Sequence, residues 1–243
     1  MLTSHLTNEL VLTGALAGLG ATLVNGCMRP ESQIFGRTIV AGHDTKEVAL
    51  TYDDGPNDAA TYDLLELLAQ HKARATFFMI GRYVQQRPDM VRAVHNAGHL
   101  VANHTMSHPW LAWQSAARIR QELADCNHAL EDALGAPVHY MRPPHGARRP
   151  AVIRIARELG LKVVQWNVMG FDWEPIGVEG ILKNIEGGLR RSRYWGRGAN
   201  ILLHDGSDIN MGFDRSDSVT ATARLLQRFA AEDCRLVTVD HWG

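Results

Sequence analysis

Apolar and polar residues follow one another along the chain in blocks that predict strands and helices in turn. A short apolar run at 48–52 predicts a buried strand, and apolar residues at helical spacing predict a helix at 61–70. Further strands are expected at 75–80, 100–102, 138–141, 163–166, 201–203 and 236–239, and further helices at 88–96, 115–134, 151–159, 176–191 and 218–231. Gly187 and Gly188 are expected to interrupt the helix at 176–191, because glycine is a poor helix former.

This alternation of strand and helix, repeated about seven times, predicts an α/β fold with parallel strands and helical crossovers, either a barrel or an open sheet. The positions of polar clusters favour the barrel. Five clusters follow five different predicted strands: Asp53–Asp54, His104 to His108, Arg142 to Gly146, Asp172–Trp173 and His204–Asp205. In a barrel these strand ends meet at one rim, where such folds carry their active sites.

The N-terminus differs from the rest of the chain. Residues 1–28 form an apolar segment, 29–46 a lead-in, and 47–243 the expected catalytic domain. Residues 10–28 carry no charge, and 19 residues are about enough for a membrane-spanning helix. Four glycines weaken that reading, and no basic residue precedes the run as in a signal peptide. Two interpretations stay open: a membrane anchor or uncleaved signal, and a helix packed on the domain.

Composition narrows the choice of partners. A hydrophobic content of 45% and a charged content of 21% in 243 residues are ordinary for a packed globular protein. The net charge of -1 gives no electrostatic reason to expect nucleic-acid binding. The three cysteines lie far apart with no CxxC pair, so buried thiols are favoured over a Cys126–Cys234 bridge. The sequence gives no indication of an oligomeric state.

The stretch TYDDGP at 51–56 places two adjacent carboxylates at the end of the first strand. Successive side chains of a strand point in opposite directions, so Asp53 and Asp54 are expected to diverge. One can then hold a cation while the other stays free to take a proton. The alternative is a polar turn in which an aspartate caps the next helix.

Two histidines follow another predicted strand. His104 and His108 stand four residues apart, and on one helical turn their imidazoles would face the same side. With Asp54 they form a set of two histidines and one carboxylate that leaves positions open for water or substrate. Zinc fits this set best for hydrolysis, and cobalt, nickel, manganese or iron can use the same ligands.

The motifs from about Glu47 to Val239 resemble, in the same order, those of the NodB-like polysaccharide deacetylases, carbohydrate esterase family 4. TYDDGP is similar to the family's TFDDGP, and the resemblance implies that Asp53 is the catalytic base and Asp54 a metal ligand. HTMSH implies that His104 and His108 are the other ligands. The resemblance also implies the fold, a distorted (β/α)7 barrel.

The stretch RPPHG is similar to the family's third motif, RxPxG. The resemblance implies that Arg142 orients the base and that the backbone N–H of His145 binds the oxyanion, at a position where the family usually has tyrosine. Pro143 and Gly146 of this motif are expected to lie against the substrate. The alternative for Arg142 is a purely structural ion pair.

Two later motifs complete the resemblance. Asp172 and Trp173 match the family's DW, which implies that Asp172 tunes the catalytic histidine and that Trp173 walls the acetyl pocket. Leu202 and His204 match LxH, which implies an acetyl-pocket residue and the general acid. Met169 replaces an aspartate that the family often has. The alternative for Asp172 is a cap on the following helix.

The expected function is a metal-dependent amidohydrolase that removes N-acetyl groups from N-acetylglucosamine units of a glycan of chitin or peptidoglycan type. The expected location is the cell envelope, periplasmic or extracellular, with a membrane anchor through residues 10–28 or a cytoplasmic location as alternatives. O-deacetylation, as in acetylxylan esterases, and an inactive glycan-binding barrel are alternative functions. For Trp110, Trp113 and Trp195 two interpretations stay open: stacking on sugar rings at the rim, and packing in the core.

Overall fold

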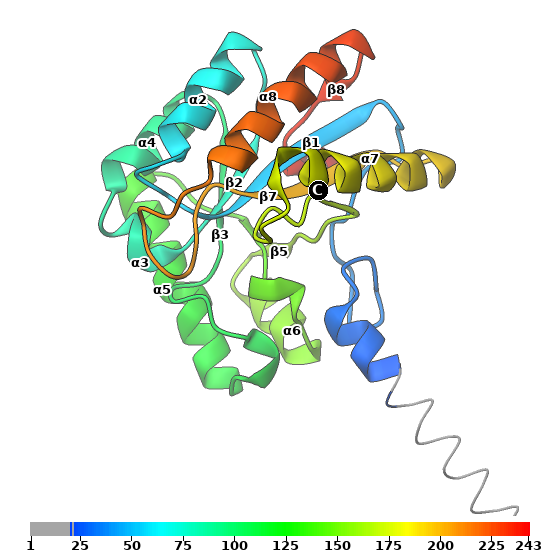
Figure 1. Cartoon of the computed structure of the whole chain (residues 1–243). Helices are drawn as coiled ribbons and strands as arrows, with labels where there is room; N and C mark the ends of the chain where they lie inside the picture. Colours follow the sequence, from blue (N-terminus) through cyan, green and yellow to red (C-terminus); the bar gives the residue numbers. More distant parts are fainter. Residues whose placement is uncertain (1–19, 21) are drawn as a thin grey trace, which may run out of the picture.

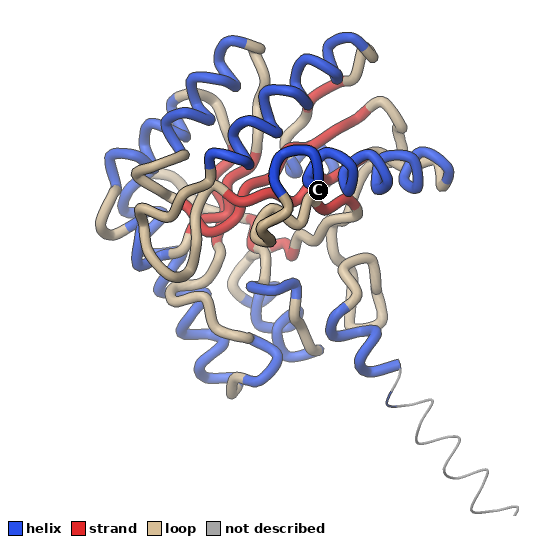
Figure 2. The backbone as a smooth tube through the Cα atoms, in the orientation of Figure 1, coloured by secondary structure: helices blue, strands red, loops and turns tan. Residues whose placement is uncertain are grey.

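The computed structural model describes residue 20 and residues 22–243, and its centre is a curled sheet of parallel strands. Figure 1 shows the chain winding between strand and helix, and Figure 2 shows the strands at the centre with helices around them. The strands are β1 (Glu47–Gly55), β2 (Thr76–Met79), β3 (Leu100–Asn103), β4 (Tyr140–Met141), β5 (Lys162–Val163), β6 (Val168–Met169), β7 (Ala199–His204) and β8 (Arg235–Leu236).

Helices connect these strands and cover the outside of the sheet. The α-helices are α2 (Thr61–Gln70), α3 (Gly81–Val84), α4 (Pro88–Asn96), α5 (Ala116–Leu134), α6 (Pro150–Glu158), α7 (Gly177–Tyr194) and α8 (Ser216–Ala231). Short 3-10 helices occur at Leu111–Trp113, Pro144–Gly146 and Val239–Trp242. The repeated order of strand and helix is therefore the one that the sequence predicts.

The order of the strands shows why the sheet must curl. The strands run β5-β4-β3-β2-β1-β7-β6, with β8 also pairing with β1. A flat sheet of this kind would separate its edge strands by about 29 Å. The chain between Val163 of β5 and Val168 of β6, at opposite edges, can span at most about 18 Å. The two edges therefore approach each other, which gives the distorted barrel that the sequence predicts.

The ends of α5 follow from local sequence signals. The Ser115 hydroxyl accepts a hydrogen bond from the backbone N–H of Arg118 (3.2 Å) and so caps the first turn. At the other end Gly135 has a φ of 67°, a left-handed conformation that favours glycine. The predicted helix at 115–134 is confirmed to within one residue.

The interruption expected in α7 is wrong, since the helix runs unbroken through Gly187 and Gly188. A Cβ atom at Gly188 would lie 2.7 Å from Cγ1 of Val168, so glycine lets α7 pack closely on β6. A Cβ atom at Gly187 would meet nothing within 4 Å. Tertiary packing here overrides the low helix propensity of glycine.

Several strands differ from their predicted bounds. β1 extends past the predicted strand and includes both aspartates of TYDDGP. The strand predicted at 163–166 ends at Val163, and β6 was not predicted, because two-residue strands carry no detectable periodicity. The strand predicted at 236–239 gives way to the 3-10 helix at Val239–Trp242.

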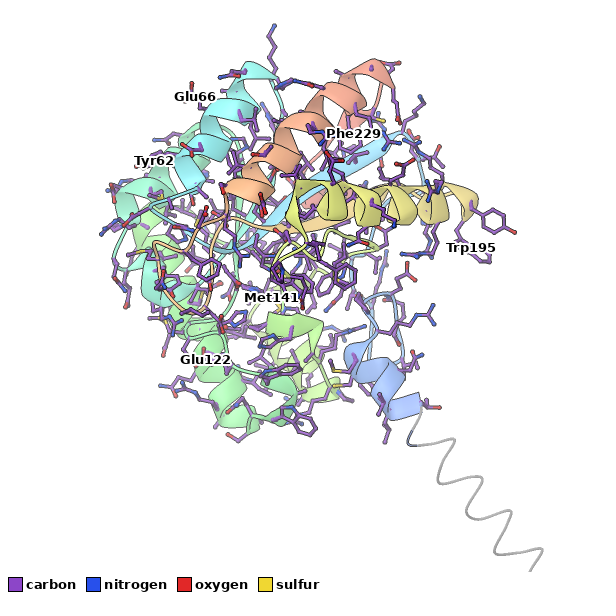
Figure 3. The ribbon with its side chains drawn as sticks, viewed as in Figure 1. Tyr62, Glu66, Glu122, Met141, Trp195 and Phe229 are labelled. Carbon is purple, nitrogen blue, oxygen red and sulfur yellow. The ribbon has the colours of Figure 1, made fainter. Side chains whose placement is uncertain are left out.

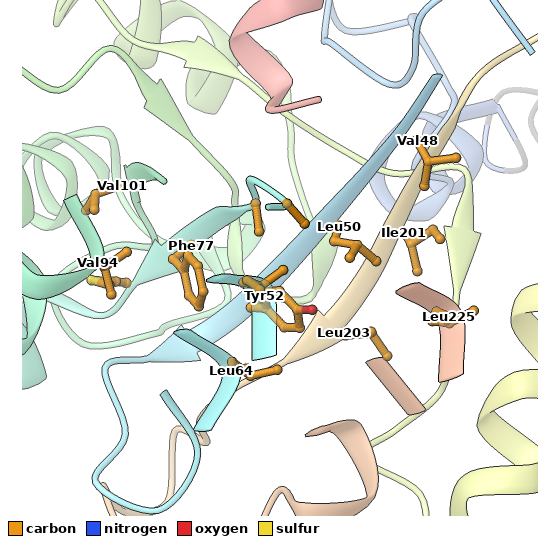
Figure 4. Close-up of a cluster of buried hydrophobic side chains, with 14 of the residues drawn as sticks. Val48, Leu50, Tyr52, Leu64, Phe77, Val94, Val101, Ile201, Leu203 and Leu225 are labelled. Carbon is orange, nitrogen blue, oxygen red and sulfur yellow. The ribbon is translucent and has the colours of Figure 1, made fainter. Parts of the chain in front are cut away.

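Two of the three apolar clusters in the described part of the chain lie on opposite faces of the sheet. Tyr52 and Leu50 of β1 point outward and pack in the cluster that includes Leu64 of α2 and Leu225 of α8 (Figure 4). The intervening residue positions point inward, where a second cluster fills the barrel: Ala49, Phe78, Ala102, Tyr140, Val164, Val237 and Val239. Apolar side chains thus close the barrel interior and leave its polar groups at the carboxyl ends of the strands.

The N-terminal segment is fastened to the barrel by one buried arginine. Residues 22–28 are helical, and the backbone carbonyl of Cys27 at the end of this helix accepts a hydrogen bond from the backbone N–H of Arg148 (3.1 Å). Arg148 Nη2 donates hydrogen bonds to the backbone carbonyls of Ser32 (2.7 Å), Arg29 (2.8 Å) and Pro30 (3.2 Å). Its Nη1 donates to Gly146 O (3.1 Å). We call this set of bonds the Arg148 clasp.

Two expectations about the N-terminus concern residues that the structure describes only in part. Most of the run at 10–28 lies outside the described residues, and within residues 20 and 22–243 no helix is long and apolar enough to cross a membrane. The division into 1–28, 29–46 and 47–243 stays a prediction. All three cysteines are free, so the Cys126–Cys234 bridge is not formed.

Candidate metal centre and active-site cleft

A bulge at the end of β1 brings both aspartates to the rim of the barrel. The pairing of β1 with β2 shifts between Asp53 and Gly55, and Asp54 has a φ of 71°. Regular alternation would send Asp54 toward the helices, whereas the bulge re-aims it. His104 Nε2 lies 3.6 Å from Asp53 Oδ2 and 3.4 Å from Asp54 Oδ1. The prediction that the two carboxylates diverge is therefore wrong.

The two histidines of HTMSH lie on a loop and not on the predicted helical turn. Thr105 and His108 have φ values of 67° and 62°, and such left-handed backbone is strained for a β-branched residue. Buried Glu122 of α5 holds the loop, since Ser107 donates to it from Oγ (2.6 Å) and from the backbone N–H (2.8 Å). This anchoring keeps the imidazole centroids of His104 and His108 5.0 Å apart.

Asp54, His104 and His108 form a cluster that fits a divalent cation. Their candidate ligand atoms all lie within 4.8 Å of one another. His104 Nδ1 lies 2.8 Å from Arg142 O, so the ring N–H points there and Nε2 is left to ligate. Asp54 Oδ1 is buried and makes no well-formed hydrogen bond within the described part of the chain. An acceptor oxygen without a donor beside two imidazole nitrogens is what a cation would satisfy.

Charge around this cluster keeps the carboxylate ionised. Burial alone would raise the pKa of Asp54, but the adjacent His104 and His108 hold it well below its usual value. Asp54 Oδ1 lies 3.1 Å from His108 Nε2. The site therefore presents its one carboxylate in the form that binds metal.

Asp53 is held by a fully buried arginine. Arg142 Nη1 lies 2.6 Å from Asp53 Oδ1 and also donates to Thr51 Oγ1 (3.0 Å). The guanidinium lies 4.1 Å from the ring centroid of Phe78, and its Nη2 donates to Gln165 O (3.2 Å). Burial lowers the pKa of Arg142, and Asp53 opposes that shift. Arg142 is thus fixed on several sides and in turn fixes the orientation of Asp53.

His204 is paired with Asp172 on the opposite side of the cluster. His204 Nδ1 lies 2.8 Å from Asp172 Oδ1, and Asp172 Oδ2 accepts hydrogen bonds from the backbone N–H of His204 (2.7 Å) and from Ser218 Oγ (2.6 Å). Burial would lower the pKa of His204, but Asp172, with Asp54 and Asp53, raises it to about 9. Both oxygens of Asp172 are engaged in this way, and α7 has no side-chain cap. The helix-cap alternative for Asp172 is therefore wrong.

The register of the sheet brings these two systems together. Asp53 of β1 and His204 of β7 are aligned partners on neighbouring parallel strands. Aligned residues on parallel strands share a face, so both side chains reach the same cleft, which has a volume of about 500 Å³. Asp54, His104, His108, Trp173 and Leu202 also line it. Pro143 and Gly146 are buried and do not line it.

His145 stands at the edge of the cleft in a strained backbone conformation, with a φ of 58°. Its exposed ring stacks on Trp110, with centroids 4.0 Å apart, and meets His108 edge-on at 4.7 Å. Partial burial, together with His108 and His104, lowers the pKa of His145 to about 4, so the ring is neutral at neutral pH. The tryptophans are not core residues, since Trp113 is 80% exposed and Trp195 is 70% exposed.

Sequence reasoning missed several residues of the cleft. Asp208 Oδ2 lies 3.3 Å from His108 Nδ1, where it can orient that imidazole. Met28 and Pro30 line the cleft from the N-terminal segment. Arg148 binds the carbonyl of Pro30. It stands two residues after RPPHG, and this position close to a motif could have pointed to it. No motif in the sequence indicated that Met28 or Pro30 lies at the site.

A curled parallel barrel with an Asp-His-His cluster at its rim is an arrangement that can hold a divalent cation for a hydrolytic reaction. The sequence model of the polysaccharide deacetylase family matches residues 41–164. The chain therefore belongs to the polysaccharide deacetylase family, and the predicted family and barrel are confirmed.

Individual relatives agree with this assignment. Chitooligosaccharide deacetylase from Bradyrhizobium sp. is 39% identical over 163 residues, 67% of this chain and 72% of the relative. Peptidoglycan-N-acetylglucosamine deacetylase from Bacillus cereus is 36% identical over 199 residues, 81% of this chain and 88% of the relative. The crystal structure of a peptidoglycan N-acetylglucosamine deacetylase bound to 4-naphthalen-1-yl-N-oxidanyl-benzamide has a TM-score of 0.74 at 29% identity, over 83% of this chain and 89% of that one.

Proposed function

We propose that this chain removes N-acetyl groups from N-acetylglucosamine units of a glycan, with zinc as the cation, in the cell envelope or outside the cell. One observation carries the proposal: Asp53 and His204, each fixed by its own partner, share one cleft with the Asp54-His104-His108 cluster. Relatives named for chitooligosaccharide and for peptidoglycan N-acetylglucosamine support the substrate class and the location.

The residues of the cleft divide the chemistry among them. A divalent cation held by Asp54, His104 and His108 would polarise the acetyl carbonyl and lower the pKa of a water. Asp53, oriented by Arg142, takes the proton of the attacking water. The backbone N–H of His145 stabilises the oxyanion, and one such donor is typically worth about 3 kcal/mol.

The leaving amine needs a proton, and His204 supplies it. The pKa of His204 is raised to about 9, so its imidazolium is the main form at neutral pH. Asp172 fixes the ring through Nδ1, which leaves Nε2 to face the cleft and donate. Trp173 packs edge-on against the His204 ring, with centroids 5.3 Å apart, and with Leu202 walls the space for the acetyl methyl group.

The test measures acetate release from an N-acetylglucosamine pentamer and from acetylated xylan, with chelator and after zinc is restored. We expect release from the pentamer, loss with chelator and recovery with zinc. His108→Ala is expected to lose both bound zinc and activity, whereas His95→Ala, which removes an exposed histidine of α4, keeps both. Release from xylan alone would indicate an O-deacetylase, and no release with zinc bound would indicate a glycan-binding barrel.

A further inference from the structure

A second hollow adjoins the active-site cleft along α7. It has a volume of about 640 Å³ and shares Pro30, Trp166 and Met169 with the lining of the cleft. One wall is the N-terminal segment with Arg29 and Glu31, and the other is a face of α7. Figure 1 shows α7 in yellow and the start of the described chain in blue below it, both on the same side of the molecule.

The hollow continues toward the end of α7. A third space of about 500 Å³ shares Arg29, Glu31 and Arg191 with the second and reaches Trp195 and Arg197. Figure 3 shows Trp195 at the end of α7 with its side chain projecting from the molecule. We call these two connected spaces the basic groove. They extend the cleft from Met169 along α7 to Trp195.

Positive charge is concentrated in the basic groove, although the whole chain has a net charge of -1. Among the described residues, five cationic side chains line it against one acidic side chain, that of Glu31: Arg29, Lys183, Arg190, Arg191 and Arg197. Arg190 is paired with Glu186 of α7 at 3.0 Å, and Arg29 lies 3.9 Å from Glu31.

Three of these cations are available to a ligand. The side chains of Lys183, Arg191 and Arg197 are exposed and have no ion pair or hydrogen bond to any residue of the described chain. Elsewhere on α7, by contrast, Arg193 is bonded to Glu232. The groove therefore offers three cations that no carboxylate of the described residues neutralises.

Glycine leaves room between two of the cations. Lys183, Gly187 and Arg191 follow one another at intervals of four residues and so stand on one face of α7. Gly187 needs no close approach, because a Cβ there would meet nothing within 4 Å. Glycine within a helix costs about 1 kcal/mol relative to alanine. Here that residue keeps the floor of the groove open between the two positive charges.

The opposite wall is fixed in place by the Arg148 clasp. Three of the carbonyl groups that Arg148 binds belong to Arg29, Pro30 and Ser32, which are residues of that wall or its neighbours. Arg148 is buried and its guanidinium has no carboxylate partner within the described residues. Within the described residues the guanidinium bonds to backbone carbonyls alone, three from the segment that it holds and one from Gly146.

We propose that the basic groove binds carboxylate groups of the glycan, so that the substrate is an anionic acetylated polymer and not a neutral one. This inference rests on the proposed function and deepens it. Guanidinium groups bind carboxylates through two parallel hydrogen bonds, which suits Arg191 and Arg197. The exposed ring of Trp195 offers a face on which a sugar beyond the reacting unit can stack.

The test uses the full chain, loaded with zinc, and two pentamers of N-acetylglucosamine. One pentamer carries carboxymethyl ethers, and the other carries carbamoylmethyl ethers of the same size without charge. The readout is the ratio of kcat/KM for the charged substrate to that for the neutral one. We expect a ratio clearly above one at about 0.02 M salt that falls toward one at about 0.5 M salt, since salt screens exposed charges.

Two variants at Gly187 form a matched pair. Gly187→Glu and Gly187→Gln place side chains of nearly equal size in open space, and only the first brings a negative charge between Lys183 and Arg191. We expect the ratio to be about two- to fivefold lower in the Glu variant than in the Gln variant. Arg191→Gln should lower the ratio similarly, whereas Arg92→Gln, on α4 away from the groove, should leave it at the wild-type value.

The outcomes separate this inference from the proposed function. Equal kcat/KM for both pentamers, unaffected by salt and by Gly187→Glu, would overturn the basic groove while leaving the deacetylase intact. If neither pentamer released acetate, calorimetric binding of the same two pentamers to the same variants would decide the matter. Preferential binding of the charged pentamer, weakened by Gly187→Glu, would support the groove, and equal binding would overturn it.

Discussion

The active-site cleft and the basic groove differ in how their charged side chains are buried and paired. In the cleft, Arg142 is paired with Asp53, and His204 with Asp172, and all four side chains are largely buried. In the groove, Lys183 and Arg191 are exposed and lack a partner in the described part of the chain. The two regions share residues of their linings, so a polymer bound in one would reach the other.

The difference teaches where each kind of charge is useful. A buried charge must be paired, because the cost of desolvating it is large, and its partner then fixes both its position and its protonation. An exposed charge keeps its hydration and costs the fold little, so it is free to act on a ligand. The cleft should therefore be intolerant of small changes, whereas the groove should tolerate them and respond mainly in substrate preference.

The largest effect is expected at the base. Asp53→Asn keeps the shape of the side chain and an acceptor for Arg142 but cannot take a proton. We expect kcat to fall by about 10²- to 10⁴-fold. Acetate release from the pentamer measures the loss. Wild-type rates in this variant would show that Asp53 is not the base.

The control for this variant is the state of the rest of the site. Zinc content by elemental analysis and the circular dichroism spectrum should match those of the wild type, because Asp54, His104 and His108 are unchanged. Loss of zinc along with activity would instead indicate that Asp53 also holds the cation, to whose ligand His104 it lies close.

The next effect concerns the acid. Asp172→Asn removes the charge that raises the pKa of His204 to about 9, so we expect kcat to fall about 10- to 100-fold at pH 8 and the alkaline limb of the pH–rate profile to move to lower pH. The limb moves to lower pH because a general acid must be protonated to act, and a His204 with a lower pKa loses its proton at a lower pH. A limb that stays at the wild-type pH would rule out His204 as the group responsible.

The stabilisation of the fold by the His204–Asp172 pair should also be lost as the pH rises. The folded-state pKa of His204 is about 9, above the ordinary value of 6.5, so the pairing with Asp172 stabilises the fold fully below about pH 6.5 and is lost as the pH rises through 9. The difference in free energy of unfolding between wild type and Asp172→Asn should therefore shrink from pH 6.5 to pH 10. Urea denaturation at the two pH values measures it.

A smaller effect is expected where the two regions join. Arg148→Met leaves several buried carbonyls without a donor, which costs about 1–3 kcal/mol per unsatisfied group. We expect faster hydrogen exchange over residues 22–32 and a lower charged-to-neutral substrate ratio. Arg149→Met is the matched control, because within residues 20 and 22–243 its side chain bonds only to Gln114 O (2.8 Å). Equal exchange in the two variants would show that the clasp does not fix this wall.

The sequence predicted much of the fold and of the site, because both depend on local patterns. Strand–helix alternation predicted a parallel α/β fold, and the polar clusters after successive strands favoured the barrel. The motifs pointed to residues now found in one cleft, including Asp53, His104 and His204. The structure differs where long-range contacts decide. The bulge that re-aims Asp54 depends on pairing with β2, and the loop that carries His108 depends on Glu122 of α5.

The walls beyond the catalytic residues were not predictable for a related reason. Arg29 and Arg191 are more than 150 positions apart, and neither belongs to a motif. They line the same groove because Arg148 holds the N-terminal segment against the barrel and because α7 packs on β6. The predicted interruption of α7 was wrong for the same reason, because long-range contacts decide it. Gly188 allows α7 to pack closely on Val168, and Gly187 faces open space.

The smallest predicted effect is a difference in thermal stability between alanine substitutions at Gly187 and at Gly188. Gly187→Ala should raise the stability of α7 by about 1 kcal/mol and Tm by about 2–4 °C, because the new methyl group meets nothing within 4 Å. Gly188→Ala should lower Tm, since its methyl group would lie 2.7 Å from Val168 Cγ1 and force α7 away from β6. Calorimetry of both variants measures the contrast. A gain in both would mean that α7 can move off the sheet, and a loss in both would mean that the floor of the groove is not open.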